Sequence, residues 1–184
     1  MYLFERQSAE ENLDHEPDFK GAVDSLVRDA ESVVVIGWRH DTGCALFDWL
    51  ATTRKKHVTV IEPFLSNVQT FRYDGVRMVY GDACAFMRLL TPAETGDAVF
   101  LWQDGPEHVF MDEAYFILGR MKTVAAGIVL ATPEGVYSQG VLGGNLYEEH
   151  RSTWHMEDYE RLGFKVVRYS PGLIGYWRSH MAVI

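Results

Sequence analysis

The sequence predicts an α/β fold of the doubly wound type, a three-layer sandwich with helices on both faces of a mostly parallel seven-stranded sheet. Short β-branched runs alternate with segments of helical periodicity along most of the chain. The last two strand-like runs have no helix between them, so we expect a C-terminal antiparallel β-hairpin. With 184 residues, 47% of them hydrophobic, the chain has the size and composition of one globular domain.

The first predicted strand rests on a continuous run of β-branched residues. Residues 33–36 are a continuous Val-Val-Val-Ile run that ends at Gly37. Such a run is typical of a strand that is buried on both faces, as in a parallel sheet. Apolar residues recur at helical spacing over 18–30 before it, and residues 43–53 after it indicate a second helix.

The same alternation predicts the remaining elements. Further strands are expected at 58–61, 76–80, 98–102, 126–131, 164–169 and 174–183, and further helices at 64–72, 83–90, 107–122 and 153–162. A Gly- and Tyr-rich loop over 132–151 is long enough to be a substrate lid, and Pro171-Gly172 is a turn signal between the last two strands. This element order indicates a Rossmann-like sheet whose last strand is antiparallel and inserted beside the fifth.

Charge and composition limit the domain organisation and the partners. The acid-rich residues 1–17 predict a flexible arm before a single domain over 18–184. The net charge of −9 disfavours nucleic acid as a partner. No apolar run approaches the roughly 20 residues of a membrane span, and no signal-peptide core is apparent, so we expect a cytoplasmic protein. Cys44 and Cys84 have no metal-binding spacing and are interpreted as free thiols.

In an open α/β sheet, ligands bind where the strands end, so the residues just after each strand are the candidates for function. An acid at the end of the second strand, here Glu62, can accept hydrogen bonds from both hydroxyls of an adenosine ribose. The alternative reading of Glu62 is a solvated loop carboxylate or a charge at the N-terminus of the next helix. Trp38 and Phe64 come after the first and second strands and can stack on adenine or contact a cation, or can simply pack in the core.

In order and spacing, four segments resemble the class I S-adenosylmethionine-dependent methyltransferases. They are Val33–Gly43, Val58–Phe64, Val76–Ala83 and Asp97–His108. The last of these looks most like a subgroup with an Asp-Gly-Pro-His-type turn. The resemblance covers about residues 18–184, and it implies S-adenosylmethionine as the cofactor. It also implies roles for residues after the first four strands, namely Gly37 in the cofactor turn, Glu62 on the ribose, Asp82 with Ala83 at the adenine, and Asp104 at the methyl-transfer site.

The first turn departs from the family pattern of alternating glycines. Gly37 is present, but Arg39 and Asp41 occupy the next alternate positions. A guanidinium forms bidentate hydrogen bonds with a carboxylate, so Arg39 can bind the carboxylate of the cofactor's methionine part. If Arg39 fills the pocket instead, the domain is a non-catalytic relative.

A metal-dependent subtype of the family would need an acid after the fourth strand and a further acidic pair after the fifth. Asp104 fits the first requirement. Thr132-Pro133-Glu134 does not fit the second, although Glu134 could substitute. Hard cations take several oxygen ligands, so we expect no metal.

Histidines are the candidate general bases, because a histidine titrates near neutral pH. His108 has the best position, beside the turn after the fourth strand, and His40 in the first turn is second. The other candidates are Tyr137, His150 and His155. Each of them can also be an ordinary surface or capping residue.

The leading hypothesis is therefore a methyltransferase that passes a methyl group directly from S-adenosylmethionine to a small-molecule acceptor. The alternative is a non-catalytic binding or scaffold module of the same fold. A nicotinamide-dependent oxidoreductase is disfavoured because the first strand is not succeeded by a Gly-x-Gly-x-x-Gly motif. The sequence leaves open whether the protein is a homo-oligomer.

Overall fold

The fold comes from a computed structural model that describes residues 23–38, 49–50, 56–91, 95, 97–169 and 172–178. Its strands are β1 (Ser32–Ile36), β2 (His57–Glu62), β3 (Val76–Tyr80), β4 (Ala98–Gln103), β5 (Gly127–Pro133), β6 (Lys165–Tyr169) and β7 (Gly172–Arg178). Its labelled helices are α4 (Leu65–Thr70), α5 (Ala83–Leu89), α7 (Met111–Val124) and α8 (Met156–Arg161), with short 3₁₀ turns η2 (Pro106–His108) and η3 (Leu146–Glu148). Residues 23–27 are also helical.

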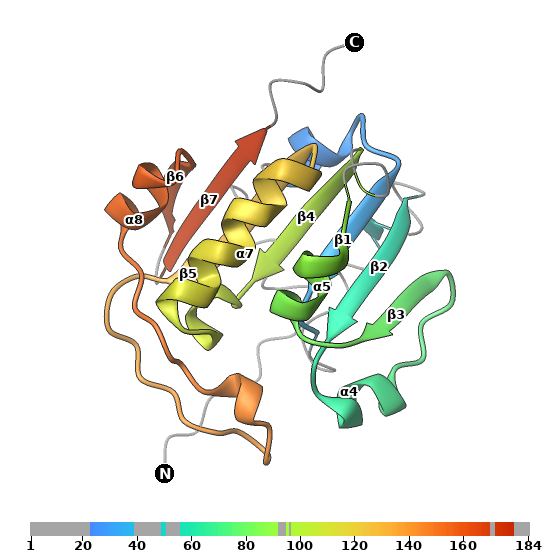
Figure 1. The fold of residues 1–184 in the computed structure, drawn as a ribbon, viewed down its shortest axis with the longest axis horizontal. Coiled ribbons are helices and arrows are strands. Elements are labelled where there is room, and N and C mark those ends of the chain that lie inside the picture. Colours follow the sequence, from blue (N-terminus) through green and yellow to red (C-terminus); the bar gives the residue numbers. More distant parts are fainter. Residues whose placement is uncertain are drawn as a thin grey trace.

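The strands form one seven-stranded sheet in the order β3-β2-β1-β4-β5-β7-β6 (Figure 1). The first five strands pair in parallel with their neighbours, and β7 pairs antiparallel with both β5 and β6. The prediction of a mostly parallel sheet with an antiparallel strand inserted beside the fifth is therefore confirmed. Because β1 lies between β2 and β4, the carboxyl ends of these three strands meet at one edge.

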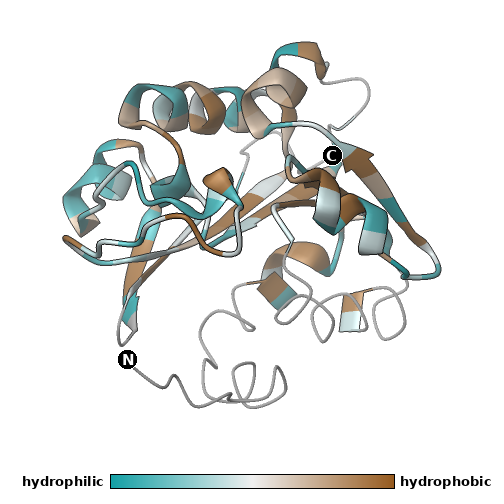
Figure 2. Cartoon of the chain, turned by 90° about the horizontal axis from the view of Figure 1, so that it is seen from below, coloured by the Kyte–Doolittle hydropathy of each residue, from teal (hydrophilic) through white to brown (hydrophobic). Residues whose placement is uncertain are grey.

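The core lies on both faces of the sheet, as the continuous β-branched runs predicted. Val34 and Ile36 of β1 pack into one buried cluster, together with Leu118 of α7. Val33 and Val35 point to the opposite face and pack with helical residues near the amino end of the described chain. Figure 1 shows α5 and α7 side by side on the first face, and Figure 2 shows apolar colour on the strands and on parts of the helices.

Two predicted helices begin three or four residues later than expected. The helix expected over 107–122 begins at Met111, because Gly105 and Pro106 fold the preceding residues into the 3₁₀ turn η2. The helix expected over 153–162 begins at Met156, where the carboxylate of Asp158 accepts a hydrogen bond from the amide of His155 at 2.9 Å.

Several expectations fall outside the described residues. These are the N-terminal arm 1–17, most of the helix 43–53, and the positions Arg39, His40, Cys44 and Pro171. Within the described residues, no helix is long and apolar enough to cross a membrane.

Candidate functional site

The turn after β1 is built on Gly37, whose φ of 79° lies in the left-handed region that glycine adopts freely. Its amide donates to the carbonyl of Ile61 in β2 at 2.8 Å, which holds the turn against the end of that strand. Trp38 comes next and is only 7% exposed, with its ring edge-on to Phe71 at 5.0 Å between centroids. The backbone of Trp38 faces the strand ends, while its ring packs among core side chains.

Glu62, the acid at the end of β2, is 3% exposed and well hydrogen-bonded. Its Oε2 accepts the amide of Trp38 at 2.8 Å, and its Oε1 accepts the amide of Phe64 at 2.8 Å and the side-chain amide of Asn67 at 3.2 Å. Burial raises the pKa of Glu62, and the three hydrogen bonds offset part of that rise. The carboxylate therefore joins the turn after β1 to the start of α4.

The predicted adenine-binding residues lie at the end of β3. Gly81 donates its amide to the carbonyl of Glu62 at 3.1 Å, so the ends of β2 and β3 are tied together. Asp82 caps α5, with Oδ1 accepting from the amide of Ala85 at 2.7 Å. Ala83 is buried at the first turn of that helix. The residues predicted for adenine thus form a helix start next to Glu62.

The turn after β4 has an unusual backbone. Asp104 adopts a φ of 45°, the one positive value among the described non-glycine residues, and its amide donates to the carbonyl of Ala131 at 2.8 Å. At Gly105, an added Cβ would lie 1.8 Å from Nε1 of Trp102, so only glycine fits. This turn directs the chain into η2, which carries Glu107 and His108.

Glu107 is a site residue that the sequence analysis did not select. Its side chain is 3% exposed, and neither carboxylate oxygen has a hydrogen-bond partner of normal geometry among the described residues. Burial and the nearby carboxylate of Asp104 raise its pKa well above the usual range, and the adjacent amides of Glu107 and Gly105 offset only part of this. Buried carboxylates without partners are costly, so this one calls for a physical explanation.

The loop after β5 returns to the β4 turn and covers it. The carbonyl of Glu107 accepts the amides of Arg151 at 2.7 Å and Ser152 at 3.1 Å. The hydroxyl of Ser152 donates to the carbonyl of Pro106 at 3.0 Å and accepts from the indole of Trp154 at 2.9 Å. These contacts hold the loop over 132–151, which was predicted as a substrate lid, against the turn after β4.

His150 lies in this loop next to His108. Its amide donates to the carbonyl of Gln139 at 2.9 Å, and its Nδ1 lies 2.6 Å from the carbonyl of Tyr137. The rings of His108 and His150 meet edge-on with centroids 4.7 Å apart. Each of Glu107, His108 and His150 offers one potential ligand atom, and these atoms all lie within 4.8 Å of one another.

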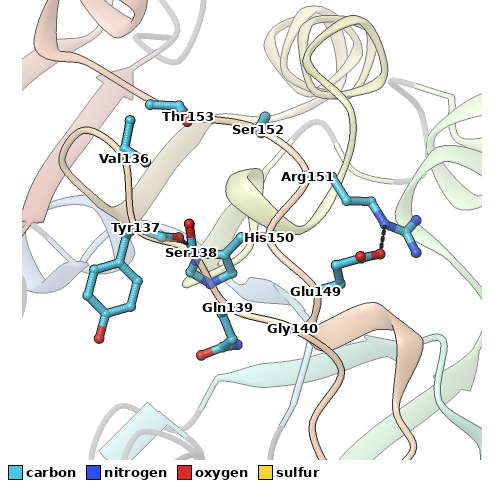
Figure 3. Close-up of a pocket in the computed structure, with 10 residues that line it drawn as sticks. All are labelled: Val136, Tyr137, Ser138, Gln139, Gly140, Glu149, His150, Arg151, Ser152 and Thr153. Carbon is cyan, nitrogen blue, oxygen red and sulfur yellow. Dashed lines mark hydrogen bonds and ion pairs between the residues drawn. The ribbon is translucent and has the colours of Figure 1, made fainter.

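A pocket of about 420 Å³ opens between the two arms of the loop, residues 136–140 and 149–153 (Figure 3). His150 is among the lining residues, so the pocket adjoins the histidine pair. Its volume is in the range of small-molecule sites. Figure 3 also shows Arg151 turned toward Glu149, with which it forms an ion pair at 3.3 Å.

Glu148 of η3 links the two ends of the site electrostatically. Its negative charge contributes to the raised pKa of both Glu62 and Glu107, although these residues lie at the ends of different strands. With Asp104, four carboxylates therefore act on one region at the carboxyl edge of the sheet. Such a region favours cationic ligands.

The other predicted candidates are placed elsewhere. Glu134 is held by Arg168 through three contacts of 2.7 to 3.0 Å, so it does not join Asp104 as the sequence analysis allowed. His155 is exposed at the start of α8. Arg39 and His40 lie outside the described residues. The signal for Glu107 was present in the Asp-Gly-Pro-Glu-His stretch, but an acid before a predicted helix is ordinarily a solvated one.

Comparison with known proteins bears on the fold. No protein-family model and no curated relative matches the sequence. The N-terminal domain of EvdMO1, solved in the presence of SAH and D-fucose, matches with a TM-score of 0.64 at 14% identity, over 96% of this chain and 85% of that chain. A SAM-dependent methyltransferase from Archaeoglobus fulgidus matches at 0.61 and 17% identity, over 87% and 71%. The methyltransferase domain of bacterial CtHen1-C matches at 0.61 and 13%, over 91% and 99%.

These likenesses are structural, because the identities are low. The chain has the fold of the SAM-dependent methyltransferases. On this fold the carboxyl edge of β1, β2 and β4 is where general topology places a ligand. The edge that carries Glu62 and Glu107 is therefore the candidate site.

Proposed function

We propose that the protein is a methyltransferase that binds S-adenosylmethionine and passes its methyl group directly to a small-molecule acceptor. The observation that carries the proposal is the buried Glu62 at the end of β2, facing the positive-φ turn of Gly37. An acid in this place is the ribose ligand of nucleoside-binding α/β folds. The shared fold of the structural neighbours supports the same cofactor.

The charge of the edge supports this cofactor over a dinucleotide. There the carboxylate of Glu148 acts electrostatically on both Glu62 and Glu107, and the carboxylate of Asp104 acts on Glu107. They attract the sulfonium cation of S-adenosylmethionine and repel the pyrophosphate of NAD. The same acidity, with the overall charge of −9, supports a small acceptor over nucleic acid.

Glu62 can accept hydrogen bonds from the ribose hydroxyls once the side chain of Asn67 moves away. A carboxylate has about four lone-pair positions, and the described hydrogen bonds use three of them. The amides of Trp38 and Phe64 belong to the backbone and stay in place, whereas the side chain of Asn67 can rotate away. One ribose hydroxyl then takes the place of Asn67 on Oε1, and the second uses the remaining position on Oε2. Phe64, Asp82 and Ala83 adjoin this position and are assigned to the adenine.

Arg39 is assigned to the carboxylate of the cofactor's methionine part. The basis is its place in the sequence, two residues after Gly37, together with the preference of guanidinium for carboxylates. Arg39→Gly should weaken binding of S-adenosylmethionine, while 5′-methylthioadenosine, which lacks the carboxylate, should bind the variant and the wild type alike. Tighter binding of S-adenosylmethionine by the variant would mean that Arg39 blocks the pocket.

We assign the acceptor to the pocket that His150 lines, and we assign Asp104 and the histidines to the reacting atoms as part of the same proposal. In the transfer step, a lone pair of the acceptor oxygen or nitrogen forms a bond to the methyl carbon. The bond from carbon to sulfur breaks, and its electron pair stays on sulfur. The acceptor's proton passes to His108 or to water, and His40 is retained as the second candidate base. Alignment of the three atoms supplies much of the acceleration.

Calorimetric titration with S-adenosylmethionine, S-adenosylhomocysteine and NAD tests the proposal. We expect the first two to bind and NAD to fail. Charged hydrogen bonds are worth roughly 1.5–3 kcal/mol, so Glu62→Ala should weaken binding by about one to two orders of magnitude. Glu31→Ala, which removes an exposed acid at the opposite end of β1, is the matched control. If neither adenosyl ligand binds the wild type, the domain is a non-catalytic module.

A further inference from the structure

The described side chains supply no hydrogen-bond donor that would stabilise the ionised form of the buried Glu107 carboxylate. Arg151 is close in space, because its amide donates to the Glu107 carbonyl. Its guanidinium is engaged elsewhere, with Glu149 at 3.3 Å, the carbonyl of Leu146 at 3.2 Å and the ring of Phe110 at 5.6 Å. Among the described residues, no donor reaches either oxygen of Glu107 with normal geometry.

Two imidazoles lie near this carboxylate, and a neutral imidazole is a common metal ligand. His108 is the next residue after Glu107 in η2, and the loop after β5 brings His150 to the same place. When Nδ1 of His150 donates to the Tyr137 carbonyl at 2.6 Å, Nε2 carries the free lone pair. A backbone carbonyl on the second ring nitrogen is the arrangement that orients metal-binding histidines.

We propose that Glu107, His108 and His150 bind a divalent first-row transition-metal cation of the Zn²⁺ class. Two imidazoles and one carboxylate suit such cations better than Mg²⁺ or Ca²⁺, which prefer oxygen ligands. The cation would also neutralise the adjacent charges of Glu107 and Asp104. This site differs from the Asp104 and Glu134 pair that the sequence analysis weighed and rejected.

The three ligand atoms must move slightly closer together to bind a cation. Ligand atoms about 2.1 Å from a tetrahedral cation lie roughly 3.4 Å apart. The three ligand atoms lie within 4.8 Å of one another. Side-chain movements of about 1 Å therefore bring them to the separation that a tetrahedral cation requires. The backbone is already fixed by the bonds from Arg151 and Ser152 to the carbonyl of Glu107.

Three protein ligands leave one position of the cation for the acceptor, as in catalytic zinc sites. This part rests on the proposed methyltransferase function. An acceptor hydroxyl bound there becomes more acidic and loses its proton to water. The resulting oxygen attacks the methyl carbon as sulfur leaves with the bonding pair. The histidines then act as ligands, and the preferred acceptor is a hydroxyl compound.

Titration of the full-length protein with Co²⁺, after treatment with EDTA, tests the site directly. We expect one equivalent to bind with the visible absorption of a mixed nitrogen and oxygen environment, Zn²⁺ to displace it, and Mg²⁺ to bind much more weakly. Glu107→Gln and His150→Gln should each weaken Co²⁺ binding by at least about 100-fold. His155→Gln and Glu157→Gln replace an exposed histidine and an exposed acid nearby and should leave it unchanged.

S-adenosylhomocysteine binding, measured on the same variants, separates this proposal from the proposed function. We expect Glu107→Gln and His150→Gln to keep their affinity for that ligand, which also shows that they are folded. Absence of Co²⁺ binding by the wild type would overturn the metal site. So would Co²⁺ binding that both variants retain. Loss of nucleoside binding by the wild type would instead count against the methyltransferase proposal alone.

Discussion

The ends of β2 and β4 each carry a buried glutamate, and the two differ in how they are satisfied. Glu62 and Glu107 are both 3% exposed, and burial raises the pKa of both. Glu62 accepts three hydrogen bonds, whereas Glu107 accepts none of normal geometry from the described residues. The two glutamates are equally buried but have opposite effects on stability. Glu62 stabilises the turns around it, whereas Glu107 lowers the stability of the protein when no cation is bound.

The difference arises in the two turns. Gly37 turns the chain so that the next amide, of Trp38, points at the carboxylate of Glu62. At β4 the turn through Asp104 and Gly105 presents amides that come near Glu107 without making good hydrogen bonds. Burial of a polar group without such bonds costs free energy, and proteins keep it mainly where function requires it.

The largest effect is expected from breaking the β4 turn. In Gly105→Ala the new Cβ would lie 1.8 Å from the indole of Trp102, so the turn must rebuild. We expect a loss of about 3 kcal/mol or more in the free energy of unfolding, measured by urea denaturation. Gly37→Ala meets no atom within 4 Å and should cost only about 1–2 kcal/mol, because its positive φ is strained for alanine.

Gly119→Ala is the control for these two glycine variants. Gly119 lies within α7 and has open space around it, so alanine should stabilise the helix by about 0.5–1 kcal/mol. A Gly105→Ala protein as stable as the wild type would contradict the close packing of this turn on Trp102.

The next largest effect is expected from replacing Glu62, and it distinguishes this glutamate from Glu107. Glu62→Ala removes the acceptor of two backbone amides, those of Trp38 and Phe64, and buried donors without partners cost about 1–3 kcal/mol. We expect the free energy of unfolding to fall by that amount in the absence of any ligand. An unchanged unfolding curve would show that water satisfies these amides and that Glu62 does not organise the turn.

Glu107→Met is expected to act in the opposite direction. The change replaces an unpaired buried carboxylate by an apolar side chain of similar length, so the metal-free protein should gain about 1–3 kcal/mol. Because the pKa of Glu107 is raised in the folded state, the wild type loses stability as the pH rises above 4.5 and through the folded-state pKa. The advantage of the variant should therefore grow with pH. Thermal unfolding in EDTA from pH 4.5 to 8 measures it, and an advantage that shrinks with pH would contradict the shift.

The sequence was sufficient for the fold and for the position of Glu62 at the carboxyl edge of the sheet. Continuous β-branched runs such as Val33–Ile36 specify buried parallel strands, and the missing helix before the last strand specifies its antiparallel pairing. Glu62 was predictable because it ends such a strand. Glu107 was not, because the segment that packs on its turn, where Arg151 and Ser152 bond to its backbone carbonyl, is distant in the sequence, and such a contact has no local pattern.

The start of α7 shows the same limit on a smaller scale. Residues 107–110 continue the helical periodicity of α7 toward its amino end, yet they form the end of η2 and two extended residues, Val109 and Phe110, before Met111. The backbone at Asp104 and the packing of Gly105 on Trp102 decide this, and both are tertiary features. His108 and His150 were each candidates as bases, but their pairing was visible only once the loop was in place.

The smallest effect concerns Asn67, which marks where the ribose is proposed to bind. Its side-chain amide donates to Oε1 of Glu62 at 3.2 Å and to the carbonyl of Trp38 at 2.9 Å. If the ribose displaces Asn67, then Asn67→Ala removes a competitor that is worth about 0.5–1.5 kcal/mol, and S-adenosylhomocysteine should bind about 2- to 10-fold more tightly. The control is Gln69→Ala, which changes an exposed side chain of α4. Weaker binding by Asn67→Ala, with Gln69→Ala unchanged, would mean that Asn67 belongs to the ligand site. Glu62 would then bind the ribose together with Asn67.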